Sequence, residues 1–513
     1  MAPSGPDVVV GVDVGTTSAK AVAFDAEGAA HGAAQAGYPL HEPSHGHAEQ
    51  DPEQVVQAAV GAIRDAARAA RAAGARIRGL SVSTAMHALV GVGADGRPLT
   101  PLLTWADTRA ADEADGLRRS TPELHLRTGT PLHPMAPLSK LMWWRAHQPE
   151  TFAAVARWGG LKELLLGGLG GGWTIDHSCA SGTGLMDLET LEWDQEALEL
   201  AGVEPQKLGR LVPATEVLEL GSDAAAELGL DAGTPLVAGA GDGPLANLGV
   251  GAVRPGVAAC SIGTSGALRL IVERPAVDAE RRVFCYALMP HRWVVGGSIN
   301  NGGVVLQWAN ETLAPDLGDH AEAQLTDLAA SVPAGSEGLI MLPYLLSERA
   351  PHWSTLPRGA YVGLTRHHRR PHLVRAALEG VCQQLALVLA SMRDGGNEVR
   401  EVRATGGFAQ SELWRRILAA ALGMPVGFPA GHEGSAFGAA LLGMEALGIV
   451  ESIDVAADLV EIADVVEPDP AEAATYAEAL PAFAALYDQL EPAFRTLARL
   501  GRHEPPPEEG PSA

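Results

Sequence analysis

Two short segments of the sequence place a glycine and several hydroxyl side chains between apolar stretches. They are residues 13–18 (DVGTTS) and residues 261–266 (SIGTSG). This pattern is typical of a β-hairpin with a tight turn, whose backbone N–H groups and hydroxyls converge on one point and suit a phosphate oxygen. One such segment alone is more often only a turn. The second copy, offset by 248 residues, favours two hairpins that grip a polyphosphate from opposite walls of a cleft.

Two aspartates could carry acid–base and metal chemistry. Asp242 stands between Gly241 and Gly243, which leaves room for a substrate hydroxyl and a phosphoryl group beside its carboxylate. That carboxylate can accept the proton of an attacking hydroxyl without an unusual pKa; alternatively, it caps the helix expected after Pro244. Asp13 has no carboxylate counterpart in the second segment. An acid there suits Mg²⁺, or it bonds only to its own turn.

The elements that must position these residues alternate between strand-like and helix-like patterns. In the first half, an amphipathic stretch at 52–73 precedes a short buried strand at 77–83. In the second half, a long helical stretch at 373–392 is followed by a strand at 399–405 and a helix at 411–422. Alternation of this kind predicts α/β architecture, in which helices flank mixed sheets.

The repeat of the hairpin pattern places a domain boundary near residue 250. We therefore expect two domains, at 8–250 and 251–502, because 513 residues exceed one hydrophobic core. Residues 503–513 are rich in Pro, Glu and Gly, which predicts a disordered tail. The cleft between the two domains is the expected site.

Composition narrows the class of protein and its partners. The formal charge of −25 argues against nucleic acid and anionic membranes as partners. No run approaches the roughly 18 apolar residues of a membrane span, and the first residues do not resemble a signal peptide. The four cysteines show neither metal-ligand spacing nor a disulfide-dense pattern, so a reduced, cytoplasmic location is expected.

Taken together, these motifs resemble the FGGY family of carbohydrate kinases, within the actin-like ATPase superfamily. The resemblance extends from about residue 8 to residue 450. Besides the hairpins it rests on Met86-His87, residues 105–109 (WADTR), residues 241–243 (GDG), and residues 407–422 with 433–442. It implies two actin-like, ribonuclease H-like α/β domains with the ATP cleft between them. It also implies ATP and Mg²⁺ as cofactors, and it is compatible with a homodimer.

The resemblance also implies roles for individual residues. Asp242 is expected to be the general base, and Asp13 together with Asp242 is expected to hold Mg²⁺. The residues expected on the phosphates are Gly15, Thr16, Thr17, Ser18, Gly263, Thr264 and Ser265. Those expected on the adenosine wall are Gly406, Gly407, Gln410 and Ser411, with residues 433–438. Trp414 is expected in the core rather than against adenine.

A second group of residues is expected to bind the acceptor. Its members are Met86, His87, Trp105, Asp107, Arg109, His133 and Arg349. For four of these residues a structural role is the alternative to acceptor binding. His87 would then serve as a structural hydrogen-bonding residue, and Arg109 would orient Asp107. His133 would shape the pocket wall, and Arg349 would pair with Glu348 or another acid.

The amino-acid sequence resembles that of the gluconate-phosphorylating branch of the family in three segments, 104–109, 129–140 and 343–351. Gluconate carries a carboxylate, and a buried carboxylate requires cations or several N–H donors. The candidates for this contact are Arg109, Lys140, Arg349 and His133. Ala88 and Ala409 depart from the residues common in relatives, which bears on the branch and not on the reaction class.

The expected activity is therefore transfer of the γ-phosphate of ATP to a terminal hydroxyl of D-gluconate, giving 6-phosphogluconate. Within the same class, a xylulokinase or another ketose or polyol kinase is the alternative. From another class, a non-metabolic actin-like ATPase would hydrolyse ATP without a small acceptor. A degenerate binding protein is disfavoured because Asp13 and Asp242 are both present.

Overall fold

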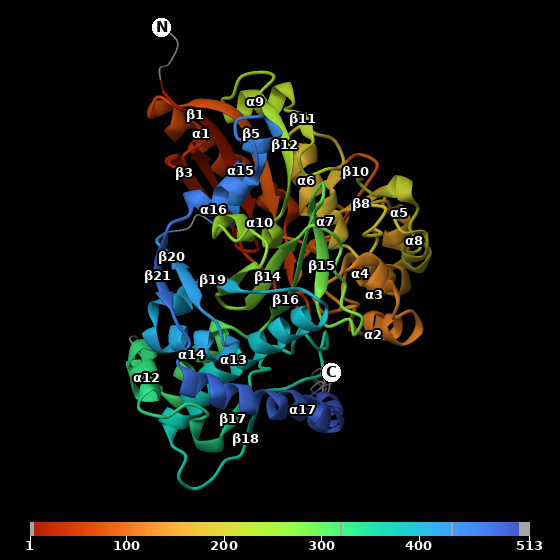
Figure 1. Cartoon of the computed structure of the whole chain (residues 1–513). Helices are drawn as coiled ribbons and strands as arrows, with labels where there is room; N and C mark the ends of the chain where they lie inside the picture. The colour runs from red at the N-terminus through yellow and green to blue at the C-terminus, as the bar shows by residue number, and fades with distance from the viewer. Residues whose placement is uncertain (1–4, 319–320, 432–433, 502–513) are drawn as a thin grey trace, which may run out of the picture.

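The computed structural model describes residues 5–318, 321–431 and 434–501, and its two large sheets organise the chain (Figure 1). The predicted tail at 503–513 and Glu433 lie outside the described residues. The first sheet has the strand order β11-β12-β5-β1-β2-β3. Its strands are β1 (Asp7–Val14), β2 (Ser18–Phe24), β3 (Ala30–Gly37), β5 (Arg76–Thr84), β11 (Val217–Glu219) and β12 (Pro235–Gly241).

The second sheet has the order β15-β16-β14-β13-β19-β20-β21. Its strands are β13 (Val257–Ile262), β14 (Gly266–Val272), β15 (Phe284–Met289), β16 (Arg292–Ile299), β19 (Glu401–Thr405), β20 (Val426–Pro429) and β21 (Ile462–Val466). Both sheets contain the same arrangement. Three antiparallel strands (β1-β2-β3 and β13-β14-β16) are followed by two parallel ones (β5-β12 and β19-β20).

The two hairpins occupy equivalent places in this repeated topology. β1 ends at Val14 and β2 begins at Ser18, while β13 ends at Ile262 and β14 begins at Gly266. Each pair of limits differs by the 248-residue offset of the sequence repeat. Because β1, β5 and β12 are parallel, their carboxyl ends meet at one edge of the first sheet, and the residues that follow them come together there.

Helices cover both faces of the first sheet. α1 (Pro52–Ala72) packs on one face, against the alternate valines of β1, such as Val10 and Val12. The other face is covered by α15 (Gly434–Ala446), from the far end of the chain; in Figure 1 this blue helix lies against the red strands. Gly11 permits this contact, because a Cβ there would stand 1.9 Å from the carbonyl oxygen of Ala436. Phe24 and Phe437 meet edge to face.

The second sheet is supported by a long central helix, α13 (Arg370–Asp394), with α11 (Gly303–Leu313), α12 (Ala321–Ala330), α14 (Glu412–Leu422) and α17 (Pro470–Gly501) around it. By length and composition alone α13 could cross a membrane, but most of its apolar stretch is buried inside the protein, as in a core helix. α10 (Asp242–Gly249) follows β12 and lies between the two halves.

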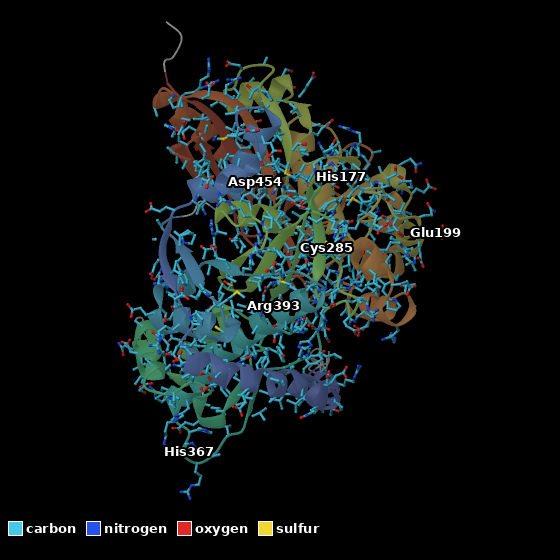
Figure 2. All side chains as sticks on the ribbon, viewed as in Figure 1. His177, Glu199, Cys285, His367, Arg393 and Asp454 are labelled. Carbon is cyan, nitrogen blue, oxygen red and sulfur yellow. The ribbon has the colours of Figure 1, made fainter. Side chains whose placement is uncertain are left out.

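A smaller helical region flanks the first sheet. It is built from α2 (Ala111–Ser120), α3 (Leu124–Thr128), α4 (Pro137–His147), α5 (Pro149–Ala154) and α8 (Gln195–Ala201) around an apolar cluster of its own. All four cysteines are free and buried. Cys285 on β15 lies near the middle of the molecule, whereas Glu199 and His367 lie toward its edges (Figure 2).

Candidate active site

The turn of the first hairpin directs backbone donors outward. Its carbonyl groups are occupied, because Tyr38 donates its hydroxyl to Gly15 at 2.6 Å and its amide to Thr17 at 3.1 Å, and Gln50 donates to Thr16. Among the described residues, the amides of Thr16 and Thr17 have no backbone or side-chain acceptor. Two adjacent unpaired N–H groups make a cradle for an anion.

The turn of the second hairpin shows the same division. The carbonyl oxygen of Gly263 accepts the amide of Gly303 at 2.6 Å, and that of Thr264 accepts the amide of Gly302 at 3.0 Å. Within the described part of the chain, the amides of Thr264 and Ser265 have no acceptor. The turn is thus anchored to the start of α11 and leaves its donors available.

Both turns border one cleft between the two halves of the chain. Thr16 of the first turn and Ser265 of the second turn line this cleft. Asp242 lines it as well. Gly15, Thr17, Ser18 and Thr264 belong to the turns without lining the cleft themselves. The first half also contributes Met86, His87 and Trp105, and the second half contributes Arg269, Phe284, Tyr286 and Arg349.

Asp242 stands at the carboxyl end of β12 and begins α10. Its Oδ1 accepts the amide of Gly243 at 2.7 Å, and its side chain does not cap the helix, so the capping alternative is not what the structure shows. Burial raises the pKa of Asp242, while the guanidinium of Arg269 and then other donors and cations oppose that rise. A carboxylate held in this way can accept a proton from a hydroxyl bound in the cleft.

Asp13 lies near the carboxyl end of β1, at the same edge of the sheet as Asp242. Ser83 donates its hydroxyl to Oδ1 of Asp13 at 2.7 Å. Burial and then the charge of Asp242 raise the pKa of the half-buried Asp13 to about 7. In the described residues no group of three or more metal-binding side chains converges. Two neighbouring carboxylates nevertheless fit Mg²⁺, which takes one or two carboxylates together with phosphate oxygens and waters.

His87 presents a neutral ring to the cleft. Its Nδ1 lies 2.7 Å from the carbonyl oxygen of Gly182, which can only accept, so Nδ1 carries the proton. Burial lowers the pKa of His87 to about 3, against the effect of that hydrogen bond. Nε2 therefore carries the lone pair and can accept a hydrogen bond. The backbone of His87 has a φ of 65°, and Lys140 supports it by donating its Nζ to the His87 carbonyl at 2.7 Å.

Residues 86–88 and 104–109 carry predicted acceptor-binding side chains, and both segments are held by Lys140; together we call them the acceptor loop. Within it, Trp105 contacts both halves of the chain. Its Nε1 donates to Thr16 Oγ1 at 2.9 Å. The guanidinium of Arg349, from the second half, lies 4.6 Å from the centroid of the Trp105 ring. Arg349 is itself oriented by bonds from Nε to Asn300 Oδ1 at 2.7 Å and from Nη2 to the Ile299 carbonyl at 3.1 Å. From Arg349 the Glu348 carboxylate accepts the backbone amide and not the guanidinium, and its other donors are Asn300 and Asn301.

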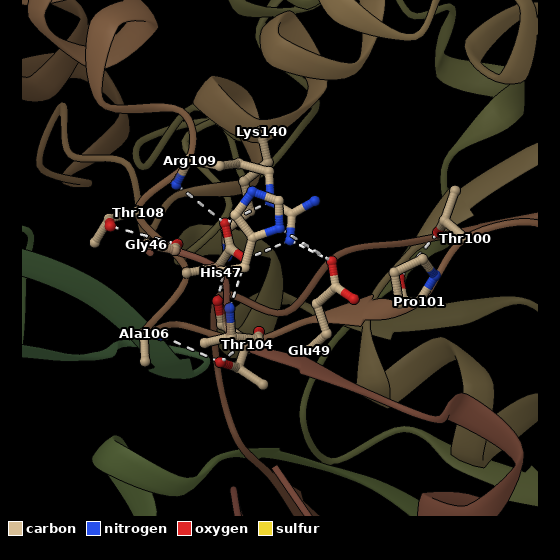
Figure 3. A network of polar contacts seen from close by, with 12 residues as sticks. Gly46, His47, Glu49, Thr100, Pro101, Thr104, Ala106, Thr108, Arg109 and Lys140 are labelled. Atoms are coloured by element: carbon tan, nitrogen blue, oxygen red, sulfur yellow. Dashed lines mark hydrogen bonds and ion pairs between the residues drawn. The ribbon is translucent and has the colours of Figure 1, made fainter. Parts of the chain in front are cut away.

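Asp107 and Arg109 do not line the cleft, whereas the sequence predicted that they contact the acceptor. Arg109 instead belongs to a network of polar contacts that includes Glu49 (Figure 3). Asp107 is 0% exposed, and its oxygens accept Arg109 Nε at 2.9 Å, Arg109 Nη2 at 2.7 Å and the amide of Ala48 at 2.9 Å. Arg109 also pairs with Glu49. The alternative in which Arg109 orients Asp107 is the one that the structure shows.

Lys140 and His133 also lie outside the cleft lining. Lys140 is fully buried, and its Nζ donates to the carbonyls of His87 and Thr104, both at 2.7 Å. His133 is 3% exposed; its Nδ1 accepts the amide of Met135, and its ring meets Trp353 edge to face. Burial lowers the pKa of His133 well below its usual value, so it stays neutral. Lys140 therefore positions the acceptor loop, and His133 belongs to the packing behind it.

Several residues of the cleft were missed by the sequence reasoning, among them Arg269, Phe284, Tyr286 and Ser298. Arg269 interrupts the otherwise apolar strand β14, and a lone arginine among buried strand residues is a signal that could have identified it. Tyr286 on β15 carries no such signal, because tyrosine is common in strands.

A second cavity borders the other side of the second hairpin. Gly263, Gly407, Gln410 and Ser411 line it together with Trp414, which is also part of the core. Gly406 does not line it. Its φ is 123°, and a Cβ there would stand 2.1 Å from the Ile262 carbonyl, so this glycine serves close packing. The sequence reasoning missed the opposite wall, which includes Asn310 and Thr326.

Comparison with known proteins identifies both halves of the chain. Residues 8–249 match the N-terminal domain, and residues 258–447 the C-terminal domain, of the FGGY family of carbohydrate kinases. Gluconokinase of Bacillus subtilis (strain 168) is 40% identical over 466 residues, which cover 88% of this chain and 90% of that protein. A crystal structure described as gluconate kinase from Lactobacillus acidophilus has a TM-score of 0.91 at 34% identity, covering 96% of this chain and 100% of that one. A ligand-bound xylulose kinase from the same organism gives the same values.

Proposed function

Because the chain belongs to the FGGY family of carbohydrate kinases, we propose that it transfers the γ-phosphoryl group of ATP to a terminal hydroxyl of D-gluconate, giving 6-phosphogluconate. The family resemblance and the predicted fold class, two actin-like α/β domains with mixed sheets flanked by helices, are confirmed. The choice of gluconate is supported by the likeness to gluconokinases along nearly the whole chain. The domain boundary near residue 250 stays a prediction.

One observation carries this proposal: Asp242 shares a cleft with both donor-bearing turns and with acceptor-type side chains from both halves. A phosphoryl group held by the turns, at Thr16 and Ser265, lies in the same cleft as the carboxylate that can deprotonate an attacking hydroxyl. Phosphoryl transfer requires mainly positioning and charge stabilisation, which such a preorganised site supplies.

In the proposed mechanism the acceptor hydroxyl loses its proton to Asp242 as it attacks the γ-phosphorus. The amides of the two turns hold the phosphate oxygens, and their rigid anchoring avoids reorganisation during the reaction. Mg²⁺, when bound, would be held by Asp13 with Asp242 and would neutralise charge on the β- and γ-phosphates. Met86, His87 and Trp105 orient the acceptor, with His87 Nε2 accepting a hydroxyl. Adenosine occupies the second cavity, beside Gly407, Gln410 and Ser411.

Closure of the two halves over both substrates would exclude water and suppress ATP hydrolysis. The stacking of Arg349 on Trp105 is a contact between the halves that can report this state.

The deciding experiment is Mg·ATP-dependent ADP release measured with D-gluconate, D-xylulose, L-ribulose, glycerol or no acceptor. We expect a gluconate-specific rate far above that of every other condition. D-xylulose belongs in the panel because a structural neighbour is described as a xylulose kinase. A preference for D-xylulose would move the assignment to a ketose kinase. Equal ADP release with and without acceptor would favour a non-metabolic ATPase and contradict the sugar-kinase assignment.

A further inference from the structure

One face of the sheet β15-β16-β14 forms a wall of the cleft. Alternate residues of β14, Ala267 and Arg269, line it, as do alternate residues of β15, Phe284 and Tyr286. The register places Arg269 and Phe284 on either side of Gly296, in one row across the three strands. Arg269 and Tyr286 therefore stand on the same wall, further from the turn than Ala267 does.

Arg269 is a cation whose donors are mostly unused. In the described residues its guanidinium makes a single hydrogen bond, from Nη1 to Ser261 Oγ at 3.4 Å, and no carboxylate lies within the 4.0 Å of an ion pair. Arg349 also has an unused donor: its Nε and Nη2 make hydrogen bonds, whereas its Nη1 makes none to the described residues. Burial lowers the pKa of Arg269, and burial with repulsion from Arg269 lowers that of Arg349 to about 10. An anion between these groups would relieve their repulsion and satisfy their donors.

Tyr286 supplies an independent observation. Its side chain is buried, at 3% exposure, and its hydroxyl has no hydrogen-bond partner among the described residues. Tyr286 lines the same cleft as the two arginines, Arg269 and Arg349. The ring is held between Phe284, stacked at 4.3 Å, and His87, edge to face at 5.6 Å. A buried hydroxyl without a partner is costly unless a ligand satisfies it.

Other cations near the acceptor loop are already satisfied by the protein. Arg109 is paired with Asp107 and Glu49, and Lys140 donates to two carbonyl groups. Of the residues that line the cleft, only Arg269 and Arg349 combine a positive charge with free donors.

We propose that Arg269, Tyr286 and the free Nη1 of Arg349 form the subsite for the carboxylate of a sugar-acid acceptor, with Arg269 as its principal charge. This inference rests on the proposed function and names the residues that distinguish an acid from a neutral sugar. The same donors could take a phosphoryl oxygen instead. The carboxylate is favoured because the phosphates already have the amides of two turns, and because Tyr286 lies beside His87 of the acceptor loop.

The test compares D-gluconate with D-gluconamide, its neutral counterpart, in the full-length protein. Dissociation constants are measured by calorimetry with ADP present, and kcat and KM by ADP release. For Arg269→Gln we expect gluconate binding and KM to weaken about 10- to 100-fold while gluconamide changes less than about threefold, since a charge-assisted contact is lost only with the acid. Tyr286→Phe, which removes one oxygen, should show the same selectivity with a smaller loss.

Arg274→Gln is the matched control, because it removes the same charge just after β14 from an exposed residue outside the cleft. Retained ATP affinity and an unchanged melting temperature show that a variant is folded. Equal losses for both ligands, or a fall in kcat with KM unchanged, would assign Arg269 to the phosphoryl group or to Asp242 and overturn the proposal. Unchanged gluconate affinity in both Arg269→Gln and Tyr286→Phe would overturn it as well. If the unmodified protein phosphorylates D-xylulose and not gluconate, the proposed function itself fails, independently of the variants.

Discussion

The indole of Trp105 donates a hydrogen bond to the hydroxyl of Thr16 across 2.9 Å, and this bond joins the acceptor loop to the first hairpin. The face of the same ring carries Arg349 from the other half of the chain. One side chain of the acceptor loop thus contacts both the first turn and Arg349. If the acceptor and the phosphoryl group bind as proposed, a shift of Trp105 moves both.

Replacing Trp105 with Phe tests this link. The variant keeps an aromatic face for Arg349 but loses the bond to Thr16, which is worth about 1 kcal/mol, or roughly fivefold in kcat/KM. Steady-state kinetics should show the loss for both ATP and the acceptor. Trp173→Phe is the control, because Trp173 also donates its Nε1 and also carries an arginine, but away from the cleft. Equal effects of the two substitutions would contradict a specific role for Trp105.

Replacing Asp242 with Asn removes the proposed general base while preserving the shape of the side chain. We expect kcat to fall by about 10²- to 10⁴-fold, the usual contribution of such a group. ATP affinity, measured by calorimetry, should change little because the turns still present their amides. A retained turnover rate would remove Asp242 from the mechanism.

Replacing Asp13 with Asn tests its contact with the metal. Removing Mg²⁺ with EDTA should abolish transfer in the unmodified protein, and activity should return with added Mg²⁺. In Asp13→Asn the Mg²⁺ concentration for half-maximal rate should rise about tenfold or more, as expected when a metal-site group is lost. Asp7→Asn, at the opposite end of the same strand, is the control. An unchanged dependence of the rate on Mg²⁺ would mean that Asp13 only stabilises its turn and does not contact the metal.

Replacing Asp107 with Asn should affect stability more than acceptor specificity. The substitution leaves Arg109 buried with one carboxylate partner fewer, which typically costs about 3–5 kcal/mol. Thermal melting should show a clear decrease. The ratio of KM values for gluconate and a neutral acceptor should stay constant, because Asp107 does not reach the cleft. A change in that ratio at unchanged stability would restore Asp107 to the acceptor site.

His125 gives a prediction for pH. It donates from Nε2 to the carbonyl of Val283, just before β15, and burial lowers its pKa to about 4. In the unfolded chain His125 binds a proton at its ordinary pKa of 6.5, whereas in the folded chain it stays neutral until the pH approaches 4. This contribution to stability is complete above about pH 6.5 and is lost as the pH falls toward 4, by about 1.4 kcal/mol per unit. Urea unfolding of the protein and of His125→Gln should differ progressively less as the pH is lowered. A constant difference would contradict a neutral, buried His125.

The hairpins and the alternation of strands and helices could be predicted because their signals are local. Glycine and hydroxyl residues mark the turns at Thr16 and Thr264, and the helical pattern at 373–392 is continuous. The site was predictable where a motif carries its own geometry, as with Asp242 between glycines. It was not predictable where partners come from distant segments. Arg109 is bonded to Glu49, 60 residues away, and no pattern in either segment announces the pair.

The same limit explains why Arg269 and Tyr286 were missed. The charge of Arg269 within an apolar strand is visible in the sequence, but its unused donors are not, and Tyr286 carries no sequence signal. Only the sheet register places both residues on the wall of the cleft, and only the hydrogen bonds of the folded chain show that the Tyr286 hydroxyl has no partner among the described residues. Unused donors are a property of the assembled structure, not of the residue type.

The position of α15 has a consequence for synthesis of the chain. The first sheet is complete when β12 has left the ribosome, but the helix that covers its second face ends at Ala446, about 200 residues later. At roughly 5–20 residues per second, that apolar face waits on the order of 10–40 s for its cover. During translation the nascent first half is therefore a natural client for a chaperone, and a stalled or truncated product should be cleared by proteolysis, since it carries that sheet face uncovered.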